Sequence, residues 1–388
     1  MPDLKSSASK RRRAGDSLAV LLLLAIIAGA GWLWWHEKPP AKNPPLQPAA
    51  VINKKGLPVI ASLAVVERKP EPVEKTNLNL PPAPPVIVSN PPNPPPPAAT
   101  AEFPRPANGV LEVQIALARR AISPGAIDGA MGSQTRAALA AFQRLQNLPA
   151  TRALDTNTLF RLMLEAPPFT DYEVTTNDLS RLQPVGKTWL AKSQQSALDY
   201  ETILELAAEK GHSYQSLIQK LNPDVVWDDV RPGTILKIPD VAYPEPADKA
   251  AFVVIHLSDK FMDAFDTDSN LLAHFPCSIA AKVEKRPVGE LRVKDIAVPA
   301  NYTVNPELFP ESAELQAIGH KLILPPGPNN PVGVAWIGLD KPGYGMHGTP
   351  SPEQIGHTES HGCFRLANWD AEYLVKLVWV GMPVEVVP

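Results

Sequence analysis

The chain has 388 residues, with 37 basic and 40 acidic side chains and a formal net charge of −3 at pH 7. This length exceeds the size at which a single hydrophobic core stops growing, so it predicts several domains. The balanced charge, without a Lys/Arg stripe interleaved with aromatic residues, argues against a nucleic-acid partner. Two cysteines in the whole chain are too few for a disulfide framework.

The N-terminus combines a basic flank with an apolar run. Residues 1–17 contain five Lys or Arg side chains, and residues 18–35 contain no charge. A run of this length can cross the ~30 Å hydrocarbon core of a membrane as a helix. We therefore expect a basic cytoplasmic tail at 1–17 and a single-pass inner-membrane anchor at 18–35. The alternative is a signal peptide cleaved near Ala30, and both interpretations place the rest of the chain in the periplasm.

Residues 36–107 form a proline-rich segment, densest at "PPAPPVIVSNPPNPPPP", without helical or strand periodicity. Such a segment cannot pack a core and favours extended polyproline II, which spans about 3 Å per residue. We expect a periplasmic linker that holds the following domains away from the membrane. A proline-rich ligand for a recognition domain is the alternative.

Residues 108–166 are expected to form a small bundle of three helices. Turn residues at Asp128-Gly129 precede a helix, and Asp155 can cap the next one. The stretch "IDGAMGSQTRAALAAFQRLQNL" resembles the peptidoglycan-binding domain 1 family, and that resemblance implies contact with the cell wall. Apolar residues at helical spacing mark the expected buried faces: Val110, Val113, Leu117, Ala138, Ala141, Phe142, Leu145, Leu159, Leu162 and Met163.

The pattern of residues 170–242 predicts a strand, two helices and a second strand, in that order. The second half, with "YETILELAAEKGHSYQSLIQKLNPD" and "VRPGTILKIPDV", resembles a LysM glycan-binding module. Some twenty extra residues, roughly Leu182 to Leu198, separate the opening strand from the first helix and depart from the LysM pattern. We expect an α+β module with an insertion, which either contacts glycan or serves as a spacer.

From residue 250 to residue 388 the pattern changes to short strands with Pro and Gly punctuation, such as "AFVVIHLSDKFMDAF" and "MPVEVV". Short strands and turn signals at regular spacing predict a mainly-β domain with few helices. The fold class expected for the whole chain is therefore multidomain, with a transmembrane helix, a helical bundle, an α+β module and a mainly-β domain.

The stretch "YGMHGTPSPEQIGHTESHGCFRL" gathers three of the eight histidines and one of the two cysteines. A thiolate nucleophile needs a nearby base, and histidine can pair with the sulfur as an imidazolium. A zinc site needs three or four converging ligands, which His347, His357, His361 and Cys363 could supply. Spacing alone leaves open a catalytic thiol, a zinc site, a bridge between Cys277 and Cys363, or no site.

The same stretch resembles the L,D-transpeptidase family, also called the YkuD domain. The family's mark is a histidine, a gap, and Ser/Thr-His-Gly-Cys followed by a hydrophobic residue and Arg or Asn. This chain has His347-Gly348-Thr349 and Ser360-His361-Gly362-Cys363-Phe364-Arg365. "RPVGEL" and "NNPVG" match two further family elements, with Arg286 where threonine is usual. The resemblance implies a YkuD-type catalytic domain at residues 250–388.

The resemblance also implies roles for individual residues. Cys363 would be the nucleophile and His347 its base. The backbone carbonyl of Gly348 would orient His347, while His361 and Gly362 would shape the oxyanion hole with Cys363. Three further residues would contact substrate: Arg365, Ser360 and Tyr344. Of these, Arg365 could bind a carboxylate of the stem peptide. No metal or other cofactor is implied.

The reaction implied is acyl transfer in peptidoglycan. Cys363 would attack the diaminopimelate carbonyl of a donor tetrapeptide stem, release D-Ala, and pass the acyl group to an amine of another stem or of a lipoprotein. Water as acceptor would make the protein an L,D-carboxypeptidase or a hydrolase of wall attachments. A non-catalytic wall-tethering protein or a zinc hydrolase would also fit the sequence. The expected partners are peptidoglycan stem peptides and glycan, the inner membrane, and a wall-anchored lipoprotein.

Overall fold

The structure is a computed structural model that describes residues 102–357 and 362–388. These residues belong to one unit of the chain, which runs from Pro92 to Pro388. The expected cytoplasmic tail, the membrane anchor and nearly all of the linker lie outside the described residues. Within the described ranges, no helix is both long enough and apolar enough to cross a membrane.

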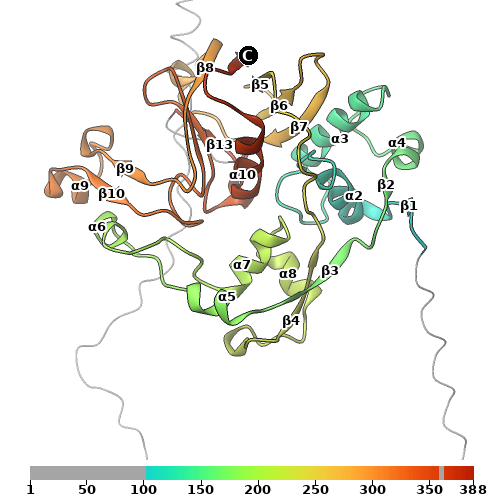
Figure 1. The fold of residues 1–388 in the computed structure, drawn as a ribbon, viewed down its shortest axis with the longest axis horizontal. Helices are drawn as coiled ribbons and strands as arrows, with labels where there is room; N and C mark the ends of the chain where they lie inside the picture. The colour runs from blue at the N-terminus through green and yellow to red at the C-terminus, as the bar shows by residue number, and fades with distance from the viewer. Residues whose placement is uncertain (1–101, 358–361) are drawn as a thin grey trace, which may run out of the picture. The chain divides into compact units, whose positions relative to one another are not determined.

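Three helices form the expected bundle at the start of the described chain (Figure 1). Asp155 caps the third helix, because its carboxylate accepts a hydrogen bond from the Thr158 amide at 2.8 Å. Met163, expected on that helix, instead lies in a short strand that pairs with the segment before the first helix. The elements are α2 (Gly109–Ala118), α3 (Ser133–Leu145) and α4 (Thr156–Arg161), with β1 (Arg105–Pro106) antiparallel to β2 (Met163–Leu164).

Buried glutamines hold the loops of this bundle. The Gln114 amide donates to the Asp128 carboxylate at 2.9 Å and accepts from the Gly129 amide at 2.8 Å. Gln143, fully buried on α3, donates to the Thr158 hydroxyl at 2.9 Å. A buried amide needs such partners, so these bonds give the Asp-Gly turn and the Phe-Gln pair of the sequence a structural role. Leu145, expected on the buried face, is 38% exposed because α3 ends there.

Residues 170–242, which we call the middle module, contain the expected strand, helix, helix and strand. Two further helices, α5 and α6, lie between the first strand and α7. The module has its own apolar core, built by Leu206, Ala207, Ile218 and Leu236. The elements are β3 (Phe169–Glu173) antiparallel to β4 (Ile235–Pro239), α5 (Thr176–Arg181), α6 (Trp189–Ser193), α7 (Ile203–Lys210), α8 (Gln215–Leu221) and the 3-10 helix η1 (Trp227–Asp229).

An eight-stranded sheet dominates the C-terminal domain, as the strand pattern predicts. Its strand order is β13-β12-β11-β8-β14-β5-β6-β7. The pairs β12–β13 and β14–β5 are parallel and the others are antiparallel. The strands are β5 (Phe252–His256), β6 (Phe261–Phe265), β7 (Leu271–Pro276), β8 (Gly289–Ala297), β11 (Trp336–Leu339), β12 (Gly345–His347), β13 (Phe364–Arg365) and β14 (Pro383–Val387).

One helix, α10 (Asn368–Leu377), follows β13 and packs its Leu374 and Leu377 into the core of the sheet. An isolated antiparallel bridge between Ser278 and Arg365 joins the segment after β7 to β13. The two ends of the strand order therefore meet at this bridge, beside the sequence that carries Cys363.

The chain leaves the sheet between β8 and β11, over residues 298–333, which we call the excursion. It contains a two-stranded antiparallel ribbon and a short helix. Its apolar residues Val304, Leu315 and Leu324 are fully buried, together with Leu198 of the middle module. The elements are β9 (Tyr302–Val304), η3 (Pro306–Leu308), α9 (Ala313–Ile318) and β10 (Leu322–Leu324); two other 3-10 helices are η2 (Val283–Lys285) and η4 (Pro352–Gln354).

The helical bundle attaches to the edge strand β7 by backbone hydrogen bonds. The Ser123 amide donates to the His274 carbonyl at 2.8 Å, and the His274 amide donates to the Ala121 carbonyl at 3.0 Å. The Ser123 hydroxyl also donates to the Asp370 carboxylate of α10 at 3.0 Å. Pairing of this kind satisfies the free backbone groups of an edge strand.

Candidate active site

Two adjacent parallel strands place His347 and Cys363 on the same face of the sheet. Met346 of β12 pairs with Phe364 of β13, and His347 pairs with Arg365. Met346 and Phe364 are both buried in the core. Because successive side chains of a strand point to opposite faces, the residues next to these two face away from the core. His347, Cys363 and Arg365 therefore share the outer face of this edge.

The imidazole of His347 is buried and oriented by its neighbours. Its Nδ1 lies 2.7 Å from the Gly348 carbonyl oxygen, and its ring stacks on Trp336 with centroids 5.7 Å apart. Trp336 is itself held, because its indole donates to the Asp295 carboxylate at 3.2 Å. A carbonyl oxygen only accepts, so Nδ1 carries the proton and Nε2 of the neutral ring is left as the base. The Gly348 carbonyl thus selects the tautomer.

The pKa of His347 is lowered to about 4, mainly by burial; the hydrogen bond to the Gly348 carbonyl opposes the shift, and the nearby Arg365 charge adds to it. The ring is therefore neutral around pH 7 and able to accept a proton.

Cys363 is half-buried in the bend immediately before β13, and its thiol donates to the Gly343 carbonyl at 3.5 Å. Burial raises the pKa of the Cys363 thiol, while a backbone hydrogen bond with Gly345 and the charge of Arg365 oppose the shift. A raised thiol pKa beside a lowered histidine pKa favours a neutral thiol–imidazole pair at rest. This differs from the imidazolium–thiolate pair considered from the sequence, because burial disfavours both charged forms.

Gly348 and Gly333 allow the backbone to approach Asn368 closely. A Cβ at either glycine would overlap the side-chain oxygen of Asn368. Gly333 also has a φ of +62°, which side chains other than glycine rarely adopt. Asn368 is fully buried at the start of α10. Glycine is therefore required at position 348, beside His347, for steric reasons.

Arg365 and Tyr302 are the other ionisable side chains whose charges act on or respond to the thiol. Burial lowers the pKa of Arg365, and the charges of Cys363 and Tyr302 oppose that shift. Burial and then the Cys363 charge raise the pKa of Tyr302, which is on β9 of the excursion. The backbone of Arg365 is fixed by two hydrogen bonds to Ser278, of 3.0 and 2.9 Å. Tyr302 belongs to none of the motifs described above, so the sequence did not mark it as a candidate.

Tyr344 lies next to Gly362, because a Cβ built on Gly362 would be 3.6 Å from the Tyr344 ring. The Tyr344 hydroxyl donates to the Lys285 carbonyl at 2.9 Å, which ties η2 to this side of the site. Tyr344 can therefore offer its ring to a ligand while its hydroxyl holds the neighbouring loop. Ser360 and His361 lie outside the described residues, so their proposed roles remain predictions.

The loop that precedes Cys363 is hydrogen-bonded to three parts of the chain: the catalytic domain itself, the helical bundle and the middle module. The Gly356 amide donates to the Ser278 hydroxyl at 2.9 Å, and Lys260 donates to the Gly356 carbonyl at 3.0 Å. Gln134 of the helical bundle donates to the Ile355 carbonyl, and Tyr214 of the middle module donates to the Glu353 carbonyl at 3.3 Å. These anchors were not candidates from the sequence, since no local pattern marks them.

The composition of the site was also compatible with zinc or with a disulfide. Among residues 102–357 and 362–388, no group of three or more His, Cys, Asp or Glu side chains could hold a metal ion. His361, one of the four ligands considered, lies in the gap between these ranges. Cys277 and Cys363, both within the described ranges, are not joined by a disulfide.

Comparison with known proteins identifies two domains. Residues 250–386 match the family model described as "L,D-transpeptidase catalytic domain" (YkuD), and residues 106–162 match "Putative peptidoglycan binding domain". "Putative L,D-transpeptidase YkuD" of Bacillus licheniformis is 26% identical over 188 residues, which make up 48% of this chain and 94% of that protein. "Probable L,D-transpeptidase YbiS" of Escherichia coli is 27% identical over 186 residues, or 47% of this chain and 59% of that protein.

Solved structures of the same name also align with the chain. L,D-transpeptidase 3 from Mycobacterium tuberculosis is 16% identical, covers 41% of this chain and 77% of that one, and has a TM-score of 0.29. The domain assignments rest on the sequence matches.

Proposed function

We infer that this protein catalyses acyl transfer between peptidoglycan peptides, with Cys363 as nucleophile. The chain carries an L,D-transpeptidase (YkuD) catalytic domain and a peptidoglycan binding domain. The observation that carries this proposal is the shared outer face of β12 and β13, where a neutral His347 and a half-buried thiol lie together. A nucleophile with a base held by a third group is the arrangement that covalent acyl transfer requires.

The first half-reaction follows from these groups. Nε2 of His347 takes the thiol proton as Sγ of Cys363 attacks the diaminopimelate carbonyl of a donor tetrapeptide stem. The carbon–nitrogen bond to terminal D-Ala then breaks, and the histidine returns the proton to the leaving amine. The donor stem remains bound to Cys363 as a thioester. The resting thiol is protonated, so removal of its proton belongs to the attack itself.

The second half-reaction transfers the acyl group. The amine of another stem, or of a lipoprotein, attacks the thioester carbonyl and gives a proton to His347. The carbon–sulfur bond breaks, and the departing Cys363 thiolate takes that proton from His347. One peptide bond replaces another, so no nucleotide is consumed. We propose that Arg365 binds a carboxylate of the stem, that Tyr344 contacts the substrate, and that Ser360, His361 and Gly362 complete the substrate and oxyanion contacts.

The location proposed for this reaction is the periplasm. Residues 18–35 would anchor the chain in the inner membrane, and the linker would let both matched domains reach the wall, which raises their effective concentration at the polymer. Alkaline extraction of membranes tests the anchor: an integral protein stays in the pellet, whereas a protein cleaved near Ala30 is released.

The function is tested by incubating the full chain with a tetrapeptide muropeptide and following intact mass and D-Ala release, beside a Cys363→Ala variant. The expected result is an acyl adduct and D-Ala release that are both absent in the variant. Products distinguish the acceptor: a cross-linked dimer indicates transpeptidation, and a tripeptide stem indicates hydrolysis. No adduct and no release, with an alkylatable thiol, would support a tethering protein instead.

A further inference from the structure

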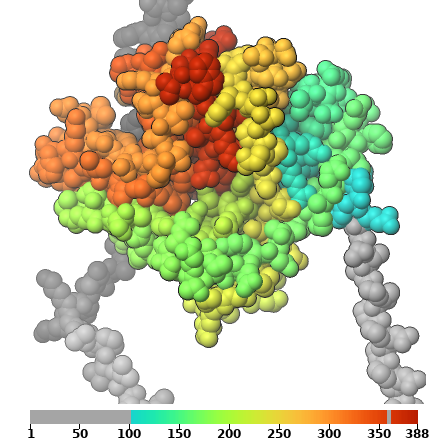
Figure 2. Space-filling model, viewed as in Figure 1, coloured from blue at the N-terminus to red at the C-terminus, as the bar shows by residue number. Residues whose placement is uncertain are grey.

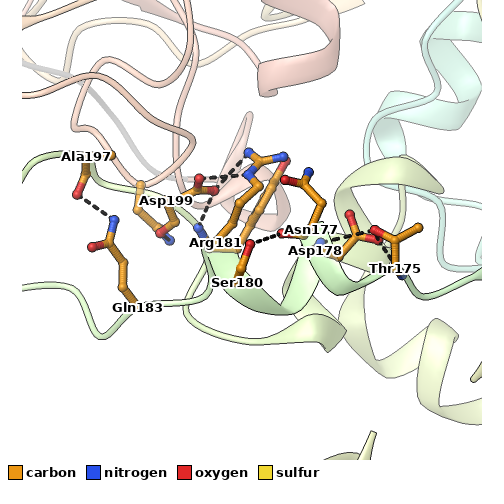
Figure 3. A network of polar contacts seen from close by, with 10 residues as sticks. Thr175, Asn177, Asp178, Ser180, Arg181, Gln183, Ala197 and Asp199 are labelled. Atoms are coloured by element: carbon orange, nitrogen blue, oxygen red, sulfur yellow. Dashed lines mark hydrogen bonds and ion pairs between the residues drawn. The ribbon is translucent and has the colours of Figure 1, made fainter. Parts of the chain in front are cut away.

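The extra residues in the middle module, 182–198, are held at their base by polar contacts. Gln183 donates to the Ala197 carbonyl at 2.8 Å. Arg181 at the end of α5 makes two hydrogen bonds to the Asp199 carboxylate, of 2.9 and 3.0 Å (Figure 3). The two ends of this inserted segment are thus closed on each other, and the segment projects from the module as a defined loop.

The apolar side of the inserted segment is buried by the catalytic domain. Leu198 is fully buried among apolar residues of the excursion, and the Trp189 ring lies 5.9 Å from that of Phe309. The amide of Leu190 donates to the Glu314 carboxylate at 3.0 Å. Helix α6 accordingly lies beside β10 (Figure 1), and the light-green atoms of this region touch the orange atoms of the excursion in Figure 2.

Backbone hydrogen bonds join the end of the segment to the return of the excursion. The Leu198 amide donates to the Pro326 carbonyl at 2.9 Å, and the Asn329 amide donates to the Leu198 carbonyl at 2.9 Å. The Asn329 side chain donates to the Asp199 carbonyl at 3.0 Å and to the Glu205 carboxylate at 2.7 Å. Asn329 therefore fastens the catalytic domain to the middle module.

The same return segment leads to His347. Asn368 donates to the Pro328 carbonyl at 3.2 Å, and its side-chain oxygen accepts from the Val334 amide at 3.3 Å. That oxygen also packs directly on Gly348, whose carbonyl holds Nδ1 of His347 at 2.7 Å. A continuous series of contacts thus runs from the middle module to the candidate base.

We propose that the inserted segment, together with Asp199 and Glu205 that follow it, is a positioning element of the transpeptidase site, which acts through Asn329, Asn368 and Gly348 to fix the ring of His347. This rests on the proposed function of the site. It assigns a positioning role to the residues that interrupt the LysM-like pattern, because Trp189, Leu190 and Leu198 contact the catalytic domain. The middle module is then part of the enzyme's active fold in addition to any contact it makes with glycan.

The test compares two asparagine variants of the full chain, Asn329→Ala and Asn222→Ala. Asn222 makes three side-chain hydrogen bonds, of 2.7 to 2.8 Å, within the middle module. It therefore controls for loss of module stability alone. The readouts are kcat and KM for D-Ala release, the melting temperature, and the rate at which iodoacetamide alkylates Cys363. Cys277 is fully buried and does not contribute to alkylation.

We expect Asn329→Ala to lower kcat and the alkylation rate by about tenfold with KM within twofold, because a misplaced base impairs the chemical step and leaves binding intact. Asn222→Ala should lower the melting temperature and leave both rates within twofold. Trp189→Ala, a second variant on the apolar contact, should lower the same two rates if Asn329→Ala does not fold.

Unchanged rates in the folded interface variants, or an equal loss in Asn222→Ala, would overturn the proposal. If the wild-type chain releases no D-Ala, the proposed function fails by itself, and the alkylation rates still decide whether the segment positions His347.

Discussion

The strand order of the catalytic sheet has two ends, and a buried histidine lies on or beside the last strand at each end, in a different setting. At β7, His274 is fully buried and its Nδ1 lies 2.6 Å from the Asp263 carboxylate, and the helical bundle pairs with the strand. At β13 and its neighbour β12, His347 is held by a backbone carbonyl and shares a face with a half-buried thiol.

The difference shows that a histidine–carboxylate pair does not by itself make a site. Nε2 of His274 is buried and has no hydrogen-bond partner among the described residues. The cysteine that follows β7, Cys277, is fully buried, and burial raises its thiol pKa to about 12. A buried thiol of this kind is inert, so exposure and a base on the same face separate a candidate nucleophile from a core residue.

Replacing the two cysteines should give the largest contrast. Cys363→Ala should lower D-Ala release by at least about 1,000-fold, because the variant loses the sulfur that forms the thioester. Cys277→Ala should keep kcat within about threefold and cost mainly stability, about 1 kcal/mol from a small cavity. Steady-state assays and denaturant unfolding measure both. Substantial turnover by Cys363→Ala would contradict the proposed nucleophile.

Replacing the two histidines should separate catalysis from packing. His347→Gln should lower kcat about 10²- to 10⁴-fold, the usual contribution of general acid–base catalysis. His274→Gln should leave kcat nearly unchanged in the folded fraction and lower the free energy of unfolding by about 1–3 kcal/mol, through loss of a buried hydrogen bond. Equal effects of the two variants on kcat would show that the second edge also takes part in the reaction.

Arg365→Gln tests the electrostatics of the β13 edge. Losing this positive charge should raise the pKa of His347 from about 4. A neutral His347 would then require a higher pH, so the acidic limb of the kcat/KM profile should move upward. If Arg365 also binds a carboxylate, KM should rise about tenfold or more. Arg292→Gln, on an exposed residue of β8, is the matched control, and an unmoved limb in Arg365→Gln would refute the assignment.

The smallest effect is expected at the contact between the bundle and β6. Arg144 of α3 lies 3.4 Å from the Asp263 carboxylate and is about half exposed. An ion pair of this exposure contributes about 0–1 kcal/mol. Arg144→Ala should therefore change the unfolding free energy by less than about 1 kcal/mol and leave D-Ala release intact. A larger loss in denaturant titrations would show that docking relies on this pair more than on backbone pairing to β7.

The local patterns of the sequence predicted several elements correctly. Spacing of apolar residues identified the helices of the bundle, Asp155 was recognised as a cap, and alternating strands marked the mainly-β domain. The YkuD motif singled out His347 and Cys363 as candidates. Each of these signals is local, since it depends on residues a few positions apart whose periodicity or chemistry survives without the rest of the chain.

The sequence alone did not reveal the roles of Tyr302, Trp336, Asn368 or Asn329, because those roles depend on neighbours far away in the chain. Asn329 meets the middle module about 130 residues earlier, and Asn368 meets Gly348 only once α10 packs against the loop. The pKa directions of His347 and Cys363 were likewise set by burial, which a motif does not report. The sequence by itself determines the residue types and the local elements. The burial of the site, the tautomer of His347 and the contacts between modules are decided only when the chain folds and excludes water from the site.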